Sequence, residues 1–280
     1  MELHDHGLAS DLEMMRRQVV DRRQVLRWML AGAATLPLIS CGGSSDASDT
    51  AAGSNAGTVT IPTTGACTVI PEETGGPYPA DGTNTNGGSI INVLNQTGVV
   101  RSDIRASFNG ATGAAAGVPL TIQLQLLSAS GGCASLAGYA VYLWHCDRAG
   151  LYSLYSSGVT AQNYLRGVQE TDSAGNLSFT TIFPGCYAGR MPHVHVEVYP
   201  SLVKAASAAN RLKTTQFTFP MATLNEAYMA SGYTASVRNL AQISYATDNV
   251  FSDGASLQMA TVAGNATQGY VATLVIAVNG

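Results

Sequence analysis

Residues 184–198 read PGCYAGRMPHVHVEV, and they carry the strongest structural signal in the sequence. His193 and His195 alternate with valines in this stretch, and residues two apart on a β-strand point to the same face of a sheet. The pattern therefore predicts a strand whose valines enter a core while both imidazoles project side by side from the opposite face. Neutral imidazole is the commonest metal ligand among protein side chains. The pair is thus either part of a metal site or two structural histidines.

Similar alternation recurs along the chain and predicts the fold class. Residues 118–126 read VPLTIQLQL, and the apolar residues expected to point inward are Leu120, Ile122, Leu124 and Leu126. Further strands are expected at 139–145, 177–183, 193–199 and 268–278, separated by turns rich in Gly, Asn, Asp and Ser. Several short alternating strands with turn residues between them indicate an all-β, antiparallel β-sandwich. Short helices are expected in loops at 202–210 and 222–231.

The N-terminal region has the features of a bacterial export signal. Residues 21–27 read DRRQVLR, a twin-arginine pattern, and a short apolar stretch follows at 28–39. Residues 38–42 read LISCG and resemble a lipobox, which predicts a lipid anchor at Cys41. A plain signal cleaved elsewhere is the alternative. We expect a signal over 1–41, a flexible Gly/Ser/Ala/Thr-rich linker over 42–65, a folded domain over 66–280, and a periplasmic or membrane-anchored protein.

Composition excludes several function classes. Charged residues make up 11% of the chain and the net charge is −4, which argues against a nucleic-acid partner. No run of apolar residues reaches the roughly 18 that a membrane-spanning helix needs. The cysteines after the signal predict up to two disulfides, with three pairings open, or else free buried thiols; they are Cys67, Cys133, Cys146 and Cys186. No C-x2-C pair supports a zinc site built from cysteines.

Five further segments, in one consistent order, carry a family resemblance. They are PEETGGPY (71–78), RSDI (101–104), AVYLWHCDRAGLYS (140–153), YLRGVQETDSAGNLSFTTI (164–182) and TTQF (214–217). Together with 184–198 they resemble the intradiol ring-cleaving dioxygenases, the family of catechol and protocatechuate dioxygenases. The similarity is greatest to exported single-domain members and covers roughly residues 66 to 220.

The resemblance implies a non-haem ferric ion, Fe(3+), whose ligands at matching positions are Tyr152, Tyr187, His193 and His195. It also implies that Arg190 lies beside the substrate ring and that Gln216 lines the pocket. The loop between the second tyrosine and the first histidine is shorter than is usual in the family. Imidazole and oxygen donors suit iron, and a phenol with a solution pKa near 10 binds as phenolate only when a strongly charged cation displaces its proton. The expected substrates are a small aromatic diol and O2, and the product is a muconate-type diacid.

Two other functions remain open on the sequence alone. One is a β-sandwich binding module that kept the scaffold and lost catalysis. The other is a zinc or copper protein that uses His193, His195 and a carboxylate, for which Glu197 on the same strand face is available, although a rim or supporting position fits Glu197 better. His145 shares a face with apolar residues and is interpreted as a core or supporting histidine. A homodimer is compatible with the sequence.

Overall fold

The structure is a computed structural model, and it describes residues 67–280. The predicted export signal, the lipid anchor at Cys41 and the linker over 42–65 lie outside the described residues and stay predictions. Within residues 67–280, no helix has both the length and the apolar character required to cross a membrane.

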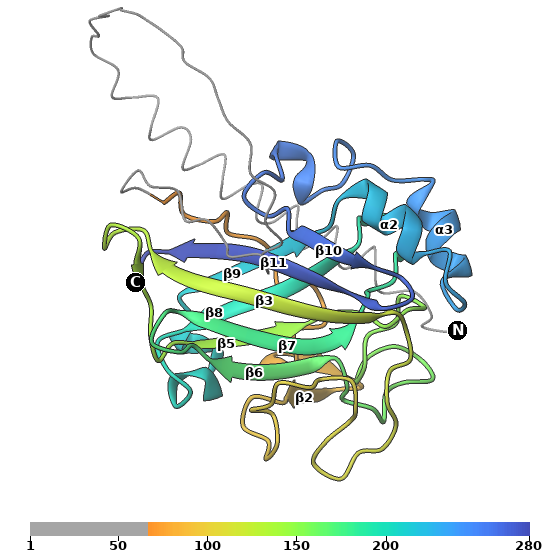
Figure 1. The fold of residues 1–280 in the computed structure, drawn as a ribbon. Coiled ribbons are helices and arrows are strands. Elements are labelled where there is room, and N and C mark those ends of the chain that lie inside the picture. The colour runs from red at the N-terminus through yellow and green to blue at the C-terminus, as the bar shows by residue number, and fades with distance from the viewer. Residues whose placement is uncertain (1–66) are drawn as a thin grey trace, which may run out of the picture.

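Two β-sheets form the body of the domain (Figure 1). One sheet has the order β10-β11-β3-β4, with β7 also paired to β3; its strands are β3 (Pro119–Ser128), β4 (Ala134–Ser135), β7 (Asn176–Ile182), β10 (Thr261–Asn265) and β11 (Gly269–Val278). The other sheet has the order β6-β5-β8-β9; its strands are β5 (Ala140–Trp144), β6 (Arg166–Glu170), β8 (His193–Tyr199) and β9 (Lys213–Thr218). The predicted all-β sandwich is confirmed.

One pairing differs from a purely antiparallel arrangement. Strand β11 runs parallel to β3 over nine residues, from Tyr270 opposite Leu120 to Val278 opposite Ser128. The long connection over 219–260 carries the chain from β9 to β10 in the other sheet, and the β10–β11 hairpin then places β11 beside β3. Side chains alternate in the same way in parallel and antiparallel strands, and the sequence pattern therefore gave no sign of this pairing.

The main hydrophobic core lies between the two sheets. The four residues of β3 predicted to point inward are buried, and so are Val194, Val196 and Val198 of β8. Phe179 of β7 and Phe217 of β9 join the same cluster. The valine face of β8 therefore packs into the sandwich, as the alternation predicted.

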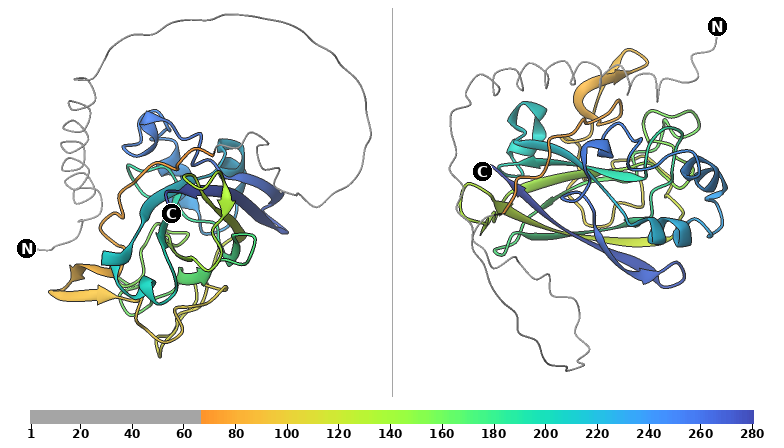
Figure 2. Two further views of the ribbon diagram at one scale, coloured as in Figure 1. Left: turned by 90° about the vertical axis from the view of Figure 1, so that its left-hand side faces the viewer. Right: turned by 90° about the horizontal axis from the view of Figure 1, so that it is seen from above.

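A second apolar layer covers the opposite face of the four-stranded sheet. It contains Tyr142 and Trp144 of β5, together with Val93 and Val99 from the segment that precedes β3. The hairpin formed by β1 (Asp81–Asn86) and β2 (Ser89–Asn92) belongs to this segment and projects from the body (Figure 2). Every residue of β8 is buried, because this strand has packing on both faces.

Short helices follow β9 and pack beside the β10–β11 hairpin (Figure 1). They are α2 (Met221–Ala227) and α3 (Thr234–Leu240). Of the 3-10 turns, η1 (Lys204–Ala206) and η2 (Ala208–Asn210) lie between β8 and β9, and η3 (Phe251–Asp253) lies between α3 and β10. The helical stretches expected at 202–210 and 222–231 correspond to η1, η2 and α2. Helix α3 was not predicted; its buried Leu240 packs into the main core.

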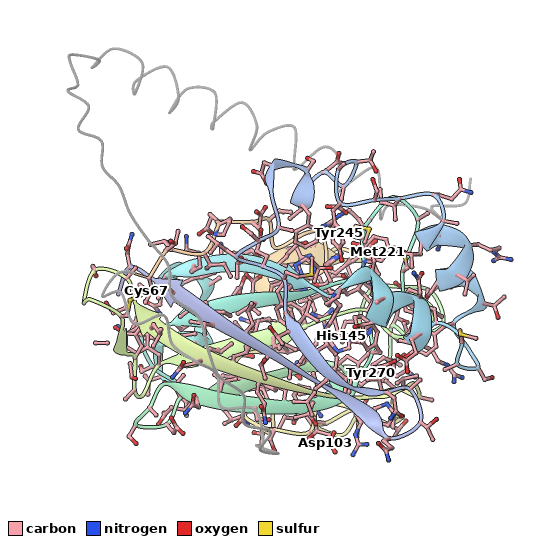
Figure 3. All side chains as sticks on the ribbon, turned by 45° about the horizontal axis from the view of Figure 1, so that its top comes forward. Cys67, Asp103, His145, Met221, Tyr245 and Tyr270 are labelled. Carbon is pink, nitrogen blue, oxygen red and sulfur yellow. A yellow bond between two sulfur atoms is a disulfide. The ribbon has the colours of Figure 1, made fainter. Side chains whose placement is uncertain are left out.

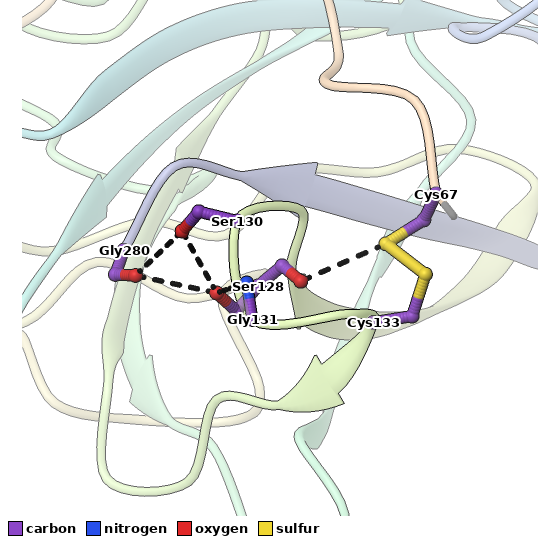
Figure 4. Close-up of a disulfide and its surroundings, with 6 residues drawn as sticks. All are labelled: Cys67, Ser128, Ser130, Gly131, Cys133 and Gly280. Atoms are coloured by element: carbon purple, nitrogen blue, oxygen red, sulfur yellow. Dashed lines mark hydrogen bonds between the residues drawn. A yellow bond between two sulfur atoms is a disulfide. The ribbon is translucent and has the colours of Figure 1, made fainter. Parts of the chain in front are cut away.

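The four cysteines within the domain divide into one disulfide and two thiols. Cys67 and Cys133 are bonded, with their Cα atoms 5.6 Å apart, whereas Cys146 and Cys186 are free and buried. The disulfide fastens the start of the described chain to the turn after β3 (Figure 4). In that turn, the hydroxyls of Ser128 and Ser130 each donate to the carbonyl of Gly280 at 3.2 Å.

Removing this disulfide should lower stability without altering the fold. The bond links residues 66 apart in sequence, and a cross-link over a loop of this size stabilises a domain by about 2–4 kcal/mol, chiefly by restricting the unfolded chain. We expect Cys133→Ala to lower the free energy of unfolding by that amount in urea titrations. Reductant should destabilise the wild type and leave the variant unchanged. Equal urea midpoints for the two proteins would contradict this assignment.

Candidate metal centre and active site

The turn after β5 positions the first tyrosine of the predicted site. Asp147 organises this turn, since its Oδ1 accepts backbone N–H groups from Ala149 at 2.8 Å and Leu151 at 3.0 Å. Its backbone carbonyl accepts N–H groups from Gly150 and from Gly185, each at 3.0 Å. Because Gly185 belongs to the loop that carries the second tyrosine, one residue fixes both loops relative to each other.

Two glycines allow these loops to interlock. Gly150 has a φ of +85°, and a Cβ added there would lie 2.9 Å from the Cβ of Tyr187. A Cβ on Gly185 would lie 2.7 Å from the carbonyl oxygens of Asp147 and Arg148. Only glycine permits such close approach of backbone to backbone. As a result the rings of Tyr152 and Tyr187 meet edge to face, with centroids 5.9 Å apart.

Strand β8 presents the two histidines to the same place. The Nδ1 of His193 contacts the carbonyl of Met191 at 2.6 Å, so this nitrogen carries the proton and Nε2 keeps its lone pair. The ring of His195 stacks on Trp144, its cross-strand partner on β5, at 4.7 Å and 3°. Both rings are thus held with Nε2 directed toward the tyrosines.

Four donor atoms converge at this point. The Oη of Tyr152 lies 3.4 Å from Nε2 of His193 and 3.3 Å from Nε2 of His195. The Oη of Tyr187 lies 3.3 Å from Nε2 of His193, and the two Nε2 atoms are 3.2 Å apart. Protein nitrogen and oxygen ligands bind transition metals at about 2.0–2.2 Å. Donor atoms with these separations are spaced as neighbouring ligands of a single ion.

Both histidines are neutral in this environment. Burial lowers the pKa of His193 well below its ordinary value, and the nearby Arg190 guanidinium lowers it further. Burial also lowers the pKa of His195 well below its ordinary value, with smaller contributions from His193, Arg190 and Arg166. Metal binding requires the neutral imidazole, so these surroundings keep both ligand candidates in the competent form.

Arg190 and Gln216 meet beside the donor cluster. Arg190 is fully buried, and its Nη2 donates to Oε1 of Gln216 at 2.7 Å. Gln216 lies opposite His195 in the β8–β9 register, and its Nε2 donates to the carbonyl of Thr74 at 2.8 Å. The two residues predicted to line the substrate pocket therefore contact each other directly. The sequence gave no sign of that contact.

The segment before β1 covers the cluster. The ring of Tyr78 packs on Tyr152 with centroids 5.0 Å apart. The carbonyl of Pro79 accepts hydrogen bonds from Tyr142 at 2.7 Å and from Arg166 at 3.1 Å. The site therefore lies between the outer face of the four-stranded sheet and this covering segment, rather than inside the sandwich.

Arg166 is a second buried arginine that the sequence did not single out as a site residue. Its Nε donates to Oγ of Ser153 at 3.1 Å, and its Nη2 donates to the carbonyl of Ser153 at 3.0 Å. Within residues 67–280 it forms no ion pair with a carboxylate at 4.0 Å or less. These two hydrogen bonds to Ser153 fix the backbone next to Tyr152. The guanidinium also adds positive potential near the histidines. Its only signal in the sequence was its place in the segment 164–182.

Two other candidate residues have structural roles. His145, labelled in Figure 3, is buried away from the cluster; its Nε2 contacts Oγ1 of Thr181 and its Nδ1 contacts the carbonyl of Cys146, both at 2.7 Å. Its interpretation as a core histidine is confirmed. Glu197 is buried rather than at a rim, and its carboxylate pairs with Arg211 at 2.7 Å and accepts from Tyr199. Glu197, the carboxylate available to the zinc or copper alternative, is thus paired with Arg211, and across 67–280 no group of three or more His, Cys, Asp or Glu side chains could hold a metal ion.

Comparison with known proteins identifies the family. A family model described as "Dioxygenase" matches residues 100–249, more than half of the chain. The chain belongs to the intradiol ring-cleavage dioxygenases. Members of this family are enzymes that open aromatic rings. The matched range contains both tyrosines and both histidines of the donor cluster, together with Arg190 and Gln216. No curated protein matches the sequence.

The chain is similar to several solved structures. An intradiol ring-cleavage dioxygenase from Tetranychus urticae aligns with a TM-score of 0.56 at 23% identity, covering 76% of this chain and 95% of that one. The dioxygenase domain of a dioxygenase–carbohydrate-binding protein fusion from Streptomyces sp. SirexAA-E aligns with a TM-score of 0.47 at 23% identity, covering 76% and 99%. A 3-chlorocatechol 1,2-dioxygenase from Rhodococcus opacus 1CP aligns with a TM-score of 0.42 at 16% identity, covering 63% and 64%.

His145 should make stability depend on pH in a predictable direction. Burial lowers its pKa from 6.5 to about 4, so between these values the unfolded chain binds a proton that the folded chain does not. The stabilisation is complete above pH 6.5 and is lost as the pH falls toward 4. We expect the unfolding free energy of His145→Gln to fall less steeply over pH 6 to 5 than that of the wild type, by up to about 1.4 kcal/mol per pH unit. Parallel curves for the two proteins would show that His145 is not held neutral.

Proposed function

We propose that this protein is a non-haem ferric dioxygenase that cleaves catechol-type aromatic diols to muconate-type diacids. In this reaction the bond between the two hydroxyl-bearing ring carbons breaks, and both atoms of O2 enter the product. The observation that carries the proposal is the convergence of two tyrosine oxygens and the Nε2 of His195 around the Nε2 of His193, each within 3.4 Å of it, beside a buried arginine.

The donor set fits the ferric ion that this family uses. Imidazole and oxygen donors suit iron, whereas thiolates select softer metals or zinc. Neither free cysteine offers a thiolate here. The Sγ of Cys186 faces the carbonyl of Arg190 at 3.4 Å, and burial raises its pKa to about 12. Burial likewise raises the pKa of Cys146 well above its ordinary value. The residues that would hold the ion are therefore Tyr152, Tyr187, His193 and His195.

The chain's own residues contribute position and electrostatics. When bound, a ferric ion would draw electron density from the diol and so make a ring carbon susceptible to attack by O2. Arg190 supplies a fixed positive charge where negative charge builds on the substrate during ring opening, and a preorganised charge in a buried site acts more strongly than one in water. Gln216 holds that guanidinium from one side. Tyr78 of the covering segment packs on the ring of Tyr152.

A binding module that has lost catalysis remains the alternative function. Such a module would need neither the arginine nor both tyrosines. In this chain all six predicted residues are present and lie close together; five of them are buried, and Tyr187 is partly exposed. The complete set favours an enzyme.

The ligand assignment can be tested through iron content. We expect His195→Ala to lose its iron and its tyrosinate-to-iron charge-transfer colour, because one of four protein ligands is replaced by an open, hydrated position. His145→Gln is the matched control, since it alters a buried histidine that lies outside the cluster, and it should keep both. Metal analysis and a visible spectrum measure the outcome. Full iron and colour in the His195→Ala protein would refute the assignment.

A second test separates an enzyme from a binding module through Arg190. Arg190→Ala should lower turnover on the order of 100- to 1,000-fold, as when one preorganised donor is removed, while it weakens catechol binding much less. Arg190→Lys should recover only part of the rate, because an ammonium lacks the planar fork of guanidinium. Oxygen uptake on a panel of catechols and spectral titration measure the two quantities. Wild-type protein that binds catechols but consumes no oxygen would favour the binding module.

A further inference from the structure

Asp248 is a buried carboxylate that connects the C-terminal part of the domain to the site. It lies in the segment between α3 and η3, and its side chain is fully buried. Its Oδ2 accepts from Nε of Arg190 at 3.0 Å and from the backbone N–H of Met191 at 2.6 Å. The carboxylate thus contacts two consecutive residues of the loop that leads into β8.

We propose that Asp248 is a positioning residue, which fixes the direction of the Arg190 guanidinium and the backbone that orients His193. This inference rests on the proposed function, since it assigns Asp248 a task in the same reaction. The carboxylate reaches the loop through Arg190 and Met191, so its effect on the site passes through these two residues.

The first part of the effect acts on the guanidinium. Arg190 donates through Nε to Asp248 and through Nη2 to Gln216. A guanidinium is planar and rigid, so two acceptors from separate elements fix both its plane and its rotation. Gln216 belongs to β9, whereas Asp248 comes from a segment that the chain reaches about thirty residues later. Loss of either acceptor would leave the group free to turn about the remaining bond.

The second part acts on the histidine through a single peptide unit. Oδ2 of Asp248 accepts the N–H of Met191, and the carbonyl of Met191 accepts the hydrogen bond from Nδ1 of His193 at 2.6 Å. A shift of the Asp248 carboxylate therefore moves the Met191 carbonyl, which sets the tautomer and the tilt of the His193 ring. Partners of this kind around a metal-binding histidine commonly affect metal affinity or activity.

Asp248 is itself held rigidly enough to perform this task. Its Oδ1 accepts the backbone N–H groups of Val250 at 2.8 Å and Phe251 at 3.1 Å, and its own N–H donates to Ser244 at 2.9 Å. Phe251 is buried in the main core and packs against Tyr245, which is labelled in Figure 3. Four hydrogen bonds to one carboxylate leave it a single orientation.

A double-mutant cycle in the iron-loaded, full-length protein tests whether Asp248 acts through Arg190. We expect Asp248→Asn to lower kcat/KM with catechol on the order of 10- to 100-fold, the size of effect that misplacing a positioned group produces. In an Arg190→Ala background the same change should cost markedly less, because only the part of the effect that passes through Met191 remains. An undiminished effect in that background would overturn the inference. Asp248→Glu keeps the charge but displaces it by one methylene, so it should fold, retain iron and still lose activity; wild-type kcat/KM in this variant would also overturn the inference.

Hydrogen exchange supplies a readout that does not depend on activity. Asp248→Asn should speed amide exchange in a peptide covering residues 187–193, where the N–H of Met191 exchanges a charged acceptor for a weaker amide oxygen or for an NH2 group, and unchanged exchange would refute the second part of the effect. Asp81→Asn is the matched control, since it removes another buried carboxylate that pairs with an arginine, Arg211, at 3.1 Å. It should leave both kcat/KM and exchange over 187–193 unchanged, and an equal loss in this control would show that the Asp248 effect is not specific. If the wild type consumes no oxygen with any catechol, the proposed function fails, while the exchange result still decides the role of Asp248 in fixing the backbone.

Discussion

The burial of β8 on both faces is the constraint on which the site depends. One face of the strand consists of valines that close the sandwich, and the other presents two imidazoles to a second packed layer. A metal-binding pair on an edge strand or a loop would be hydrated and mobile. On this central strand, Trp144 stacks on the ring of His195, and the carbonyl of Met191 accepts the hydrogen bond from Nδ1 of His193. The same burial keeps the histidines neutral, so rigidity and chemical competence have a single cause.

The electrostatics of the site depend on two buried arginines whose guanidinium groups have different kinds of hydrogen-bond acceptor. Arg190 forms an ion pair with the carboxylate of Asp248. The hydrogen-bond acceptors of Arg166 are instead carbonyls and hydroxyls. Dipoles can satisfy the N–H groups of a guanidinium without cancelling its charge. Arg166 therefore leaves positive potential behind the donor cluster, which suits the proposed binding of phenolate and diol oxygens. A buried charge of this kind is costly for stability, and its place next to Ser153 suggests a function rather than a packing role.

How much the sequence could predict follows from the range of each interaction. Alternation is local, so the strand with His193 and His195, the buried residues of β3 and the sandwich class were predicted correctly. The candidate site residues were chosen from the family resemblance, and their convergence needed the loop contacts at Gly150 and Gly185 that only the folded chain shows. Asp248 and Arg166 were missed because nothing near them in sequence marks them. The two site residues that Asp248 contacts, Arg190 and Met191, lie 57 or more residues away, and the hydrogen-bond partners of Arg166 lie 13 to 87 residues away. The parallel entry of β11 was missed for a different reason, since strand direction leaves no trace in side-chain alternation.

The Cys67–Cys133 bond also has a mechanical consequence. The covering segment begins soon after Cys67. Within about twelve residues of this cysteine, Thr74 contacts Gln216, Tyr78 contacts Tyr152 and Pro79 contacts Arg166. Any tension applied to the chain upstream of Cys67 is transmitted through the disulfide into the turn after β3, and from there into the larger sheet. The covering segment is thereby shielded from load. Force applied at the N-terminal end of the domain would therefore leave the covering segment in place over the site.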